Sequence, residues 1–322
     1  MTPDEPLRLG LLSTARINAP IVAAARASDR VDVVAVASRD AARADAYARE
    51  HGIERAHASY EALLADPGVD AVYVSLPNAL HVPWSVRSLE AGKHVLCEKP
   101  LAPDADEAER AFDAADAARC VLMEAFMYRH HPQTAQVVEL VRGGAIGRVR
   151  AARADFTFRL RDPSDIRLDA GLGGGALMDV GCYCVSGLRL LLGEPERVVG
   201  EQVLAPTGVD ESFHGTLRFA DDVVGQFVAS FALPQHQQLE LLGEGGSIFV
   251  EAPWRTDWGG RLAVTRGGRR EATPVTPDDS YRLELERFAD ATQGRVEPSL
   301  GRDDGIGQAR TIAALYRSAK PA

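Results

Sequence analysis

The sequence predicts a chain of two domains: a doubly wound α/β domain followed by an α+β domain with a large, mainly antiparallel, open sheet. Two patterns support this prediction. Apolar runs of strand length alternate with helical stretches over the first 125 residues, and after about residue 145 hydrophobic and polar residues alternate as in antiparallel strands. At 322 residues the chain is long enough for two cores. We expect domains at 1–125 and 126–322, with a last helix at about 303–319 that packs back on the first domain.

The composition and the charge balance exclude several classes of protein. The chain is 46% hydrophobic and 25% charged, as is typical of soluble globular proteins. Lys and Arg number 36 against 46 Asp and Glu, and the formal net charge of −10 argues against nucleic acids or anionic membranes as partners. The N-terminus, MTPDEPLRLG, lacks the features of a secretory signal, and no uninterrupted apolar run approaches the length of a membrane span. With only four cysteines, we expect a reduced, cytoplasmic protein.

The first half contains apolar segments that we expect to form parallel strands. Strands that alternate with helices in this way build a sheet covered on both faces, the Rossmann arrangement. The second strand is followed by a helical stretch that Gly52 ends. The expected strands lie within LRLGLLSTARI, VDVVAVAS, DAVYVSLP, KHVLCEKP and CVLMEAF.

The turn after the first strand lies where a dinucleotide pyrophosphate binds in this arrangement, at the N-terminus of the first helix. The fingerprint G-x-G-x-x-G is not met, because Gly10 is followed by other small residues in place of further glycines. Ser13 and Thr14 can still cap the helix and donate hydroxyl hydrogen bonds to phosphate. An ordinary strand–turn–helix fits this stretch equally well. The candidate cofactor-binding residues here are Gly10, Ser13, Thr14, Ala15, Arg16 and Ile17.

The end of the second strand indicates which dinucleotide binds. NAD-specific sites usually place Asp or Glu there, on the ribose 2′-hydroxyl, whereas this strand ends in Ser38-Arg39. A hydroxyl and a guanidinium suit a 2′-phosphate, because Arg offers charge-assisted donors in a fork. We expect the next residue, Asp40, to be the N-cap of the following helix. The strand end therefore favours NADP, with NAD as the open alternative.

Lys99 precedes a proline in HVLCEKPLA and is expected at the carboxyl end of a strand. Proline pushes the preceding residue towards extended geometry, and ligands bind at the carboxyl edge of open α/β sheets. The stretch LPNALH, at 76–81, ends the preceding strand at the same edge. The alternative is a lysine in an exposed surface loop.

At Glu98-Lys99-Pro100 the chain resembles the Gfo/Idh/MocA family of two-domain oxidoreductases. The resemblance covers nearly the whole chain and is strongest at 70–101, 123–132 and 173–193. It implies that Lys99 lies beside the nicotinamide and the substrate hydroxyl, with a cis peptide bond to the proline. It also implies further site residues: Leu76, Pro77, Asn78, His81, Glu98 and Arg129 for the cofactor, and Phe156 for the substrate.

The stretch GGGALMDVGCYC, at 173–184, has helical spacing after its glycines. Residues four apart share a face of an α-helix, so we expect Asp179 and Tyr183 to point the same way. Cys182 and Cys184 are two apart and diverge, and no other cluster of ligands lies nearby in the sequence. We therefore expect both thiols to make apolar core contacts, and we predict no metal site and no redox pair.

Tyr183 could simply pack in the core, but the resemblance implies a catalytic role. Many family members have Asp-x-x-x-His here, whereas the branch with glucose–fructose oxidoreductase, NADP-dependent D-xylose dehydrogenase and dimeric dihydrodiol dehydrogenase has a tyrosine, as in Asp179-x-x-x-Tyr183. A phenol has an ordinary pKa of about 10 and is a poor base near neutrality, but a neighbouring ammonium lowers that value. Tyr183 would be the general base in oxidation and the general acid in reduction, with Lys99 as the ammonium and Asp179 orienting the substrate or the lysine.

The leading hypothesis is an NADP-dependent dehydrogenase or reductase that acts on a CH–OH group of a small-molecule sugar or related polyol, as aldose 1-dehydrogenases do. Three alternatives stay open: a trans-1,2-dihydrodiol dehydrogenase, a non-catalytic NADP-binding regulator, and an NAD-assisted glycosidase. The polar, proline-broken stretch RLRDPSDIRLD, at 159–169, is expected to form a loop over the substrate. The resemblance further implies a homodimer or homotetramer, formed through one face of the second domain's sheet.

Overall fold

The structure, a computed structural model, describes residues 5–319. The chain forms two compact units, Met1–Met127 with Tyr281–Ile306 and Tyr128–Ser280 with Gly307–Ala322. The first unit thus takes in a segment from far beyond residue 125. We keep the division at 125/126 as a proposal for where the two domains are joined.

The first unit is built on a parallel sheet of six strands in the order β3-β2-β1-β4-β5-β6. Its strands are rich in Val, Leu and Ala and largely buried, because helices cover both faces of such a sheet. The doubly wound α/β prediction is therefore confirmed, although the short strand β3 was not expected. The strands are β1 (Leu7–Leu11), β2 (Val31–Ala37), β3 (Arg55–His57), β4 (Ala71–Val74), β5 (His94–Glu98) and β6 (Leu122–Ala125).

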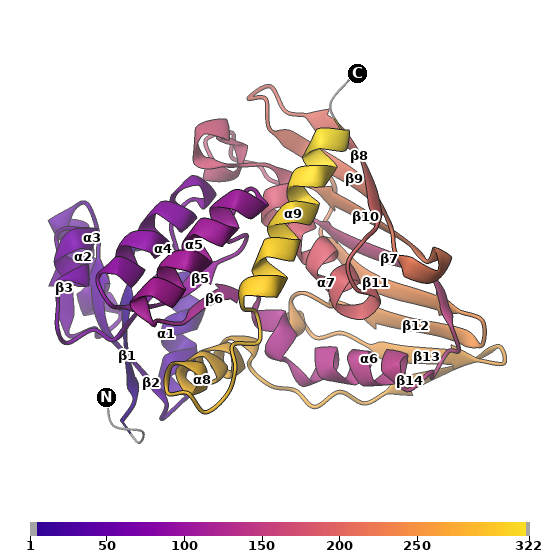
Figure 1. Ribbon diagram of the computed structural model, residues 1–322, viewed down its shortest axis with the longest axis horizontal. Helices are drawn as coiled ribbons and strands as arrows, with labels where there is room; N and C mark the ends of the chain where they lie inside the picture. Colours follow the sequence, from indigo (N-terminus) through magenta and orange to yellow (C-terminus); the bar gives the residue numbers. More distant parts are fainter. Residues whose placement is uncertain (1–4, 320–322) are drawn as a thin grey trace. The chain divides into compact units, whose positions relative to one another are not determined.

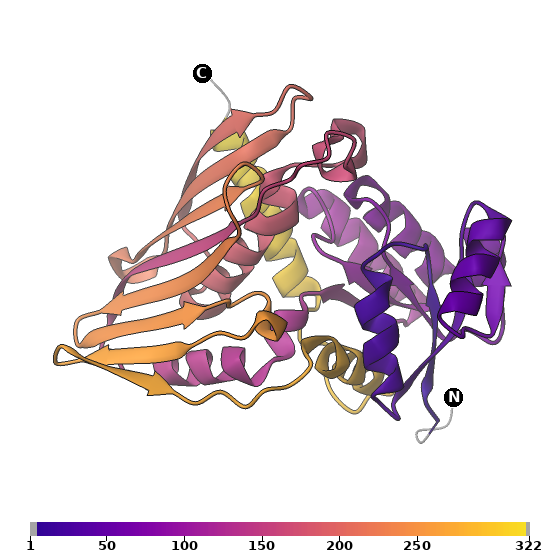
Figure 2. The same ribbon diagram turned by 180° about the vertical axis from the view of Figure 1, so that it is seen from behind.

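The helices of this unit lie on both faces of the sheet, and α2, α3 and α5 begin at the polar caps Asp40, Ser59 and Asp104. Helices α4 and α5 lie on one face, and α1 lies on the other (Figures 1 and 2). Asp40 caps α2, as predicted, and accepts hydrogen bonds from the amides of Ala42 and Arg43 at 2.9 and 3.3 Å. The helices are α1 (Asn18–Arg26), α2 (Ala41–Glu50), α3 (Tyr60–Leu64), α4 (His81–Glu90), α5 (Ala105–Ala118) and α8 (Ser280–Thr292).

The second unit is built on a sheet of eight strands in the order β14-β13-β12-β11-β7-β10-β9-β8. Neighbouring strands are antiparallel except β7 and β10, which run parallel. The prediction of a mainly antiparallel sheet is confirmed. The strands are β7 (Val149–Thr157), β8 (Arg197–Leu204), β9 (Asp210–Arg218), β10 (Val224–Ser230), β11 (His236–Gly243), β12 (Gly246–Glu251), β13 (Leu262–Arg266) and β14 (Arg269–Thr273).

Helices α6 (Pro132–Arg142), α7 (Cys182–Leu192) and α9 (Arg302–Ser318) lie on one face of this sheet (Figures 1 and 2). Helix α9 spans the division between the two units, which falls between Ile306 and Gly307. Its first residue, Arg302, binds Asp113 and Asp116 of α5 at 2.7 and 2.8 Å. The longer part of α9, from Gly307 onward, belongs to the second unit, where Gln308 donates to the carbonyl of Cys182 at 2.7 Å.

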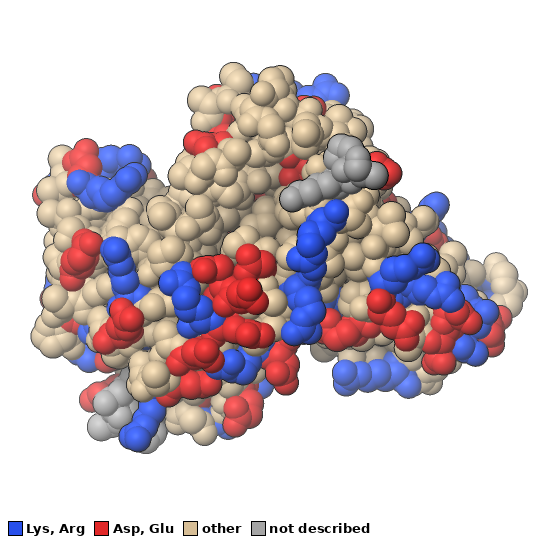
Figure 3. Space-filling view, turned by 45° about the horizontal axis from the view of Figure 1, so that its top comes forward, with Lys and Arg blue, Asp and Glu red and all other residues tan. Residues whose placement is uncertain are grey.

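One helical stretch, Ala170–Leu192, is long and apolar enough to cross a membrane by length and composition alone. The stretch includes Asp179 and Arg189, so it is not an uninterrupted apolar run. Most of the stretch is buried inside the second unit, so we describe it as a core helix. On the face of the molecule that Figure 3 shows, basic side chains are interspersed with acidic ones, in keeping with the net charge of −10.

Candidate active site

The loop between β1 and α1 has an unusual set of backbone groups. Helix α1 begins at Asn18, and its N-cap, Ile17, makes no side-chain capping bond. The prediction that Ser13 or Thr14 caps this helix is therefore wrong. The Ser13 hydroxyl is instead bonded to Ser75, at 3.0 Å from the carbonyl and 2.7 Å from the hydroxyl, and holds the loop to the strand end.

Three amides of this loop point to an anionic ligand. The N–H groups of Thr14, Arg16 and Ile17 have no hydrogen-bond acceptor within residues 5–319. Unpaired amides just before a helix, together with the helix dipole, form a ready anion site. The loop is braced by Asn18, whose buried side chain donates to the carbonyl of Ser13 at 2.7 Å. These features fit a pyrophosphate despite the missing glycines.

Besides the predicted Ser38-Arg39 pair, a second arginine, Arg43, lies near the end of β2. Arg43, one turn into α2, reaches back to within 3.3 Å of the Thr14 hydroxyl. Ser38 is buried and its hydroxyl accepts from the amide of Asp40 at 3.2 Å, while Arg39 is exposed. Because the Asp40 carboxylate is occupied in capping, the strand end presents hydroxyls and guanidinium groups. Arg43 was not among the residues predicted from the sequence.

The carboxyl ends of β4 and β5 bring several predicted residues together. Leu76 and Pro77 follow β4, and Asn78 begins a short 3-10 helix that leads into α4. His81 is buried, with Nδ1 2.8 Å from the carbonyl of Pro100 and Nε2 2.8 Å from that of Leu76. Burial lowers the pKa of His81. This histidine therefore connects the loop after β4 to the loop after β5 through its two ring nitrogens.

Glu98 and Lys99 stand at the end of β5, and the peptide bond from Lys99 to Pro100 is cis. The buried hydroxyl of Tyr73, on the neighbouring strand β4, donates to Glu98. Glu284 of α8 is also buried, and burial, with the nearby charge of Glu98, raises its pKa well above the usual value. Buried groups thus fix the residue directly before Lys99.

In the second unit, Tyr183 lies on α7 among three aromatic rings. Its ring centroid is 5.4 Å from that of Phe156, 5.9 Å from that of Tyr128 and 6.4 Å from that of Trp254. Trp254 is fully buried and its indole donates to the carbonyl of Asp155 at 3.0 Å. Tyr183 itself is 7% exposed. These three ring contacts restrict the phenol ring. Of the three neighbours, only Phe156 was among the predicted site residues.

The turn before α7 is π-helical, over Leu177–Gly181. The prediction that Asp179 and Tyr183 share a face assumed α-helical spacing throughout. It stays a prediction, because a π-helical turn also leaves residues four apart within a small fraction of a turn of each other. Widened turns of this kind occur often at functional sites. Cys182 and Cys184 are buried in the core, as predicted.

Asp179 takes part in an ion pair that the sequence analysis missed. Nε of Arg167 lies 2.7 Å from Oδ2 of Asp179, and its Nη1 lies 3.2 Å from Oδ1 of Asp165. The attraction of Asp179 holds the pKa of the Arg167 guanidinium above its usual value. Arg167 comes from the stretch 159–169, the loop that was expected to cover the substrate.

A buried carboxylate holds the start of this helical segment. Oδ2 of Asp210, on β9, accepts from the amide of Leu177 at 2.6 Å, and Oδ1 accepts from the hydroxyl of Tyr316, on α9, at 2.8 Å. Asp210 is 3% exposed. Burial raises its pKa to about 6, although both hydrogen bonds act in the opposite direction.

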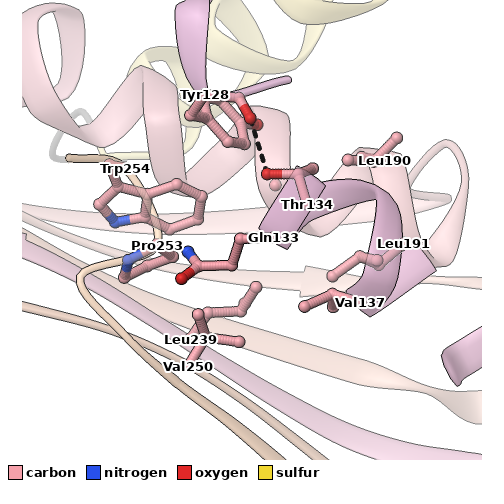
Figure 4. A pocket seen from close by; sticks show the side chains of 11 residues that line it. Tyr128, Gln133, Thr134, Val137, Leu190, Leu191, Leu239, Val250, Pro253 and Trp254 are labelled. Atoms are coloured by element: carbon pink, nitrogen blue, oxygen red, sulfur yellow. Dashed lines mark hydrogen bonds between the residues drawn. The ribbon is translucent and has the colours of Figure 1, made fainter. Parts of the chain in front are cut away.

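Arg129 is bonded to α7, and a small apolar pocket lies elsewhere in the second unit. Nη1 of Arg129 donates to the Ser186 hydroxyl of α7 at 3.2 Å. The pocket lies between α6, α7 and the sheet, and Gln133 points into it beside Pro253 and Trp254 (Figure 4). Its lining is almost wholly apolar and holds none of the predicted site residues. Within residues 5–319, no group of three or more His, Cys, Asp or Glu is arranged to hold a metal ion.

Two family descriptions match the chain. Residues 8–126 match the "Oxidoreductase family, NAD-binding Rossmann fold", and residues 134–249 match the "GFO/IDH/MocA C-terminal domain". With the amides before α1 and the strand ends described above, they define an oxidoreductase that binds a nicotinamide dinucleotide. The chain belongs to the Gfo/Idh/MocA family, as the resemblance at Glu98-Lys99-Pro100 implied.

Relatives with assigned activities align along most of the chain. A D-xylose 1-dehydrogenase (NADP(+)) of Haloferax volcanii is 41% identical over 98% of both chains. A trans-1,2-dihydrobenzene-1,2-diol dehydrogenase of Danio rerio is 35% identical over 76% of this chain and 75% of that protein. A crystal structure of a 3-ketoreductase from Actinomadura kijaniata, in complex with NADP and TDP-benzene, superposes with a TM-score of 0.92 at 32% identity, over 97% of this chain and 98% of that chain.

Proposed function

We propose that this protein is an NADP-dependent dehydrogenase that oxidises the C1 hydroxyl of an aldose such as D-xylose, and that can run the reverse reduction. The observation that carries the proposal is the setting of Tyr183, a proton-transfer group held among three aromatic rings. It stands one turn after Asp179, as in the tyrosine branch of the family. Similarity to a D-xylose 1-dehydrogenase along nearly the whole chain supports the substrate class.

The residues of the first unit fit NADP. The unpaired amides of Thr14, Arg16 and Ile17 suit the pyrophosphate. Arg39 and Arg43, with the hydroxyls of Ser38 and Thr14, suit a 2′-phosphate, because guanidinium groups bind phosphate through charge-assisted hydrogen bonds. We propose Gly10, Ala15, Leu76, Pro77, Asn78, Glu98 and Arg129 as further residues that line the cofactor site.

The chemistry needs one group to accept a hydride and another to accept a proton. The nicotinamide supplies the hydride acceptor when NADP+ is bound. In the proposed mechanism, the Tyr183 phenolate takes the proton of the substrate hydroxyl, and in reduction the phenol returns it. Lys99 stabilises the phenolate and binds the same substrate oxygen. Asp179 orients the sugar through a second hydroxyl, and Phe156 forms a wall of the substrate pocket.

His81 and Glu98 act in this proposal by holding other groups in place. Both ring nitrogens of His81 lie at hydrogen-bonding distance from backbone carbonyls, so we assign it a role in positioning the two loops rather than contact with the cofactor. Glu98 is held by Tyr73 and fixes the backbone that precedes Lys99. Such supporting bonds matter, because displacement of a reacting group by about 1 Å can cost 10²-fold in rate.

A trans-dihydrodiol is the second candidate substrate. The ring of Phe156 beside Tyr183 would suit a ring-shaped apolar substrate as well as a sugar. A trans-1,2-dihydrobenzene-1,2-diol dehydrogenase is also among the relatives.

The deciding experiment measures reduction of NADP+ and of NAD+ by the purified protein with D-xylose, other aldoses and a trans-dihydrodiol. We expect turnover with NADP+ and an aldose. Turnover with the dihydrodiol alone would select the second candidate. Binding of NADP+ without turnover of any substrate would contradict the proposal and favour a regulatory protein, and sugar-bond cleavage without net cofactor reduction would favour a glycosidase.

We further propose a cytoplasmic homo-oligomer that associates through the uncovered face of the second sheet. Helices α6, α7 and α9 cover one face. On β8 the residues that alternate away from that face include Val199 and Val203, which are 47% and 56% exposed. Leu242 of β11 is 43% exposed. Light scattering tests the assembly, and a monomer at all concentrations would contradict it.

A further inference from the structure

Arg167 connects the loop after β7 to the helical turn that carries Asp179. Its Nε and Nη1 bind carboxylates from two different segments, Asp179 at 2.7 Å and Asp165 at 3.2 Å. Asp165 also accepts from the Arg167 amide at 3.0 Å. One guanidinium thus bridges a carboxylate of the loop and one of the predicted active site.

This ion pair differs from an ordinary surface salt bridge. The carboxylate side chains of Asp165 and Asp179 are only 11% and 16% exposed, against 37% for the Arg167 side chain. Exposed pairs contribute little because water screens them and their side chains are mobile. A planar guanidinium that is held by two shielded carboxylates keeps a fixed orientation, which a lysine cannot reproduce.

The backbone of Arg167 is also held in place, by the glycines that precede the helical segment. Its carbonyl accepts from the amide of Gly175 at 2.9 Å, and a Cβ on Gly174 would lie 2.4 Å from the same carbonyl oxygen. Gly175 has a φ of 129°, which side-chain-bearing residues rarely adopt. The glycine run at 173–175, which the sequence analysis noted without explaining, therefore lets the Arg167 loop lie directly against the start of the helical segment.

We propose that Arg167 is a positioning residue for Asp179 and so controls how the substrate is oriented for hydride removal. This inference rests on the proposed function, in which Asp179 binds a substrate hydroxyl. Arg167 pairs its charge with that of Asp179 and restricts the carboxylate to one orientation. Without Arg167, the shielded carboxylate loses this charge partner and the orientation that it imposes, and the sugar binds with its C1 hydroxyl displaced from Tyr183.

The test compares Arg167→Ala and Arg167→Lys with the wild-type protein and with Arg8→Ala. Arg8 is the matched control, because it binds the shielded carboxylate of Asp70 at 2.6 Å but lies on β1 in the first unit. For each protein we would measure kcat and KM for the best substrate and the dissociation constant of NADP+. Each assay is repeated with added guanidinium ion, at concentrations far below those that unfold proteins.

We expect Arg167→Ala to lower kcat/KM by about 10²-fold, mainly through kcat, with NADP+ affinity within roughly twofold of wild type. Added guanidinium should restore activity by about tenfold, because the ion can occupy the vacated position between the two carboxylates. The kcat/KM of Arg167→Lys should lie between those of wild type and Arg167→Ala, because lysine keeps the charge but not the planar, forked set of donors. Arg8→Ala should keep wild-type kinetics and show no response to guanidinium.

Three results would overturn the inference: unchanged kcat/KM in Arg167→Ala, a loss that follows only the folded fraction or NADP+ affinity, or no rescue by guanidinium. If Arg167→Ala does not fold, Arg167→Lys carries the test, and wild-type kinetics in that variant would count against the role. An inactive wild-type protein would instead contradict the proposed function, so the two failures are distinguishable.

Discussion

Replacement of Asp210 by asparagine tests how the helical segment of the site is held. Asp210 is 3% exposed, and its pKa is raised from the usual 3.8 to about 6, first of all by burial. A raised pKa means that the folded protein binds this proton more tightly than the unfolded chain does. Stability from this group therefore grows as the pH falls through 6 towards 4, and is lost as the pH rises through 6.

The magnitude follows from the two pKa values. At about pH 4.5 the preferential protonation of folded Asp210 stabilises the protein by about 2 kcal/mol relative to about pH 7.5. Asparagine cannot ionise, but its oxygen can accept from Leu177 and its amide can donate to Tyr316, so the variant should fold. The unfolding free energy of wild type minus that of Asp210→Asn should therefore rise by about 2 kcal/mol as the pH falls from about 7.5 to about 4.5.

Urea denaturation of both proteins at a series of pH values measures this difference. The titration of the other carboxylates cancels, because both proteins carry them. Tyr316→Phe is the matched control, because it removes one hydrogen bond to Asp210 and leaves the carboxylate in place. It should lower stability by about 1 kcal/mol at neutral pH and by less in acid. A pH-independent difference between wild type and Asp210→Asn would refute the reasoning.

Three further predictions concern the cofactor site, the aromatic packing and an ion pair. Arg43→Ala should weaken NADP+ binding by about 10-fold and leave NAD+ nearly unchanged, and equal losses in a fluorescence titration would contradict its role. Gly187→Ala should lower stability by about 1–3 kcal/mol, because a Cβ there would lie 2.5 Å from the Trp254 ring, and an unchanged melting temperature would refute this. Burial raises the pKa of Asp70, but hydrogen bonds from Arg8 outweigh it and the net shift is downward. Arg8→Ala should therefore cost up to about 1 kcal/mol above the usual pKa of Asp70 and less below it, as acid titration of stability would measure. A cost that grows in acid would count against this pairing.

Much of the fold could be predicted because local patterns determine it. Each buried parallel strand is a short apolar run, and the antiparallel strands alternate in polarity, so periodicity alone separated the two kinds of sheet. Asp40 was recognised as a cap because capping depends only on nearby residues. The short strand β3 escaped prediction because its residues, Arg55–His57, carry no apolar pattern.

The supporting residues of the site could not be predicted in the same way. Arg167 and Asp179 are 12 residues apart, and Asp210 and Tyr316 are 106 apart, so their pairing depends on how the chain folds back on itself. Trp254 approaches Tyr183 from beyond the end of β12 for the same reason. Arg43 carried a weak local signal, one helical turn beyond Ser38-Arg39. The π-helical turn at Leu177–Gly181 could not be predicted, because no sequence rule marks such a turn.

The most direct test of the central claim is the kinetics of Tyr183→Phe. Phenylalanine keeps the packing against Phe156, Tyr128 and Trp254 and removes only the hydroxyl. We predict that NADP+ reduction with the best substrate falls by about 10²- to 10⁴-fold, while the dissociation constant of NADP+ stays within roughly twofold of wild type. Turnover close to wild type in this variant would contradict the account, because the proton would then leave through another group.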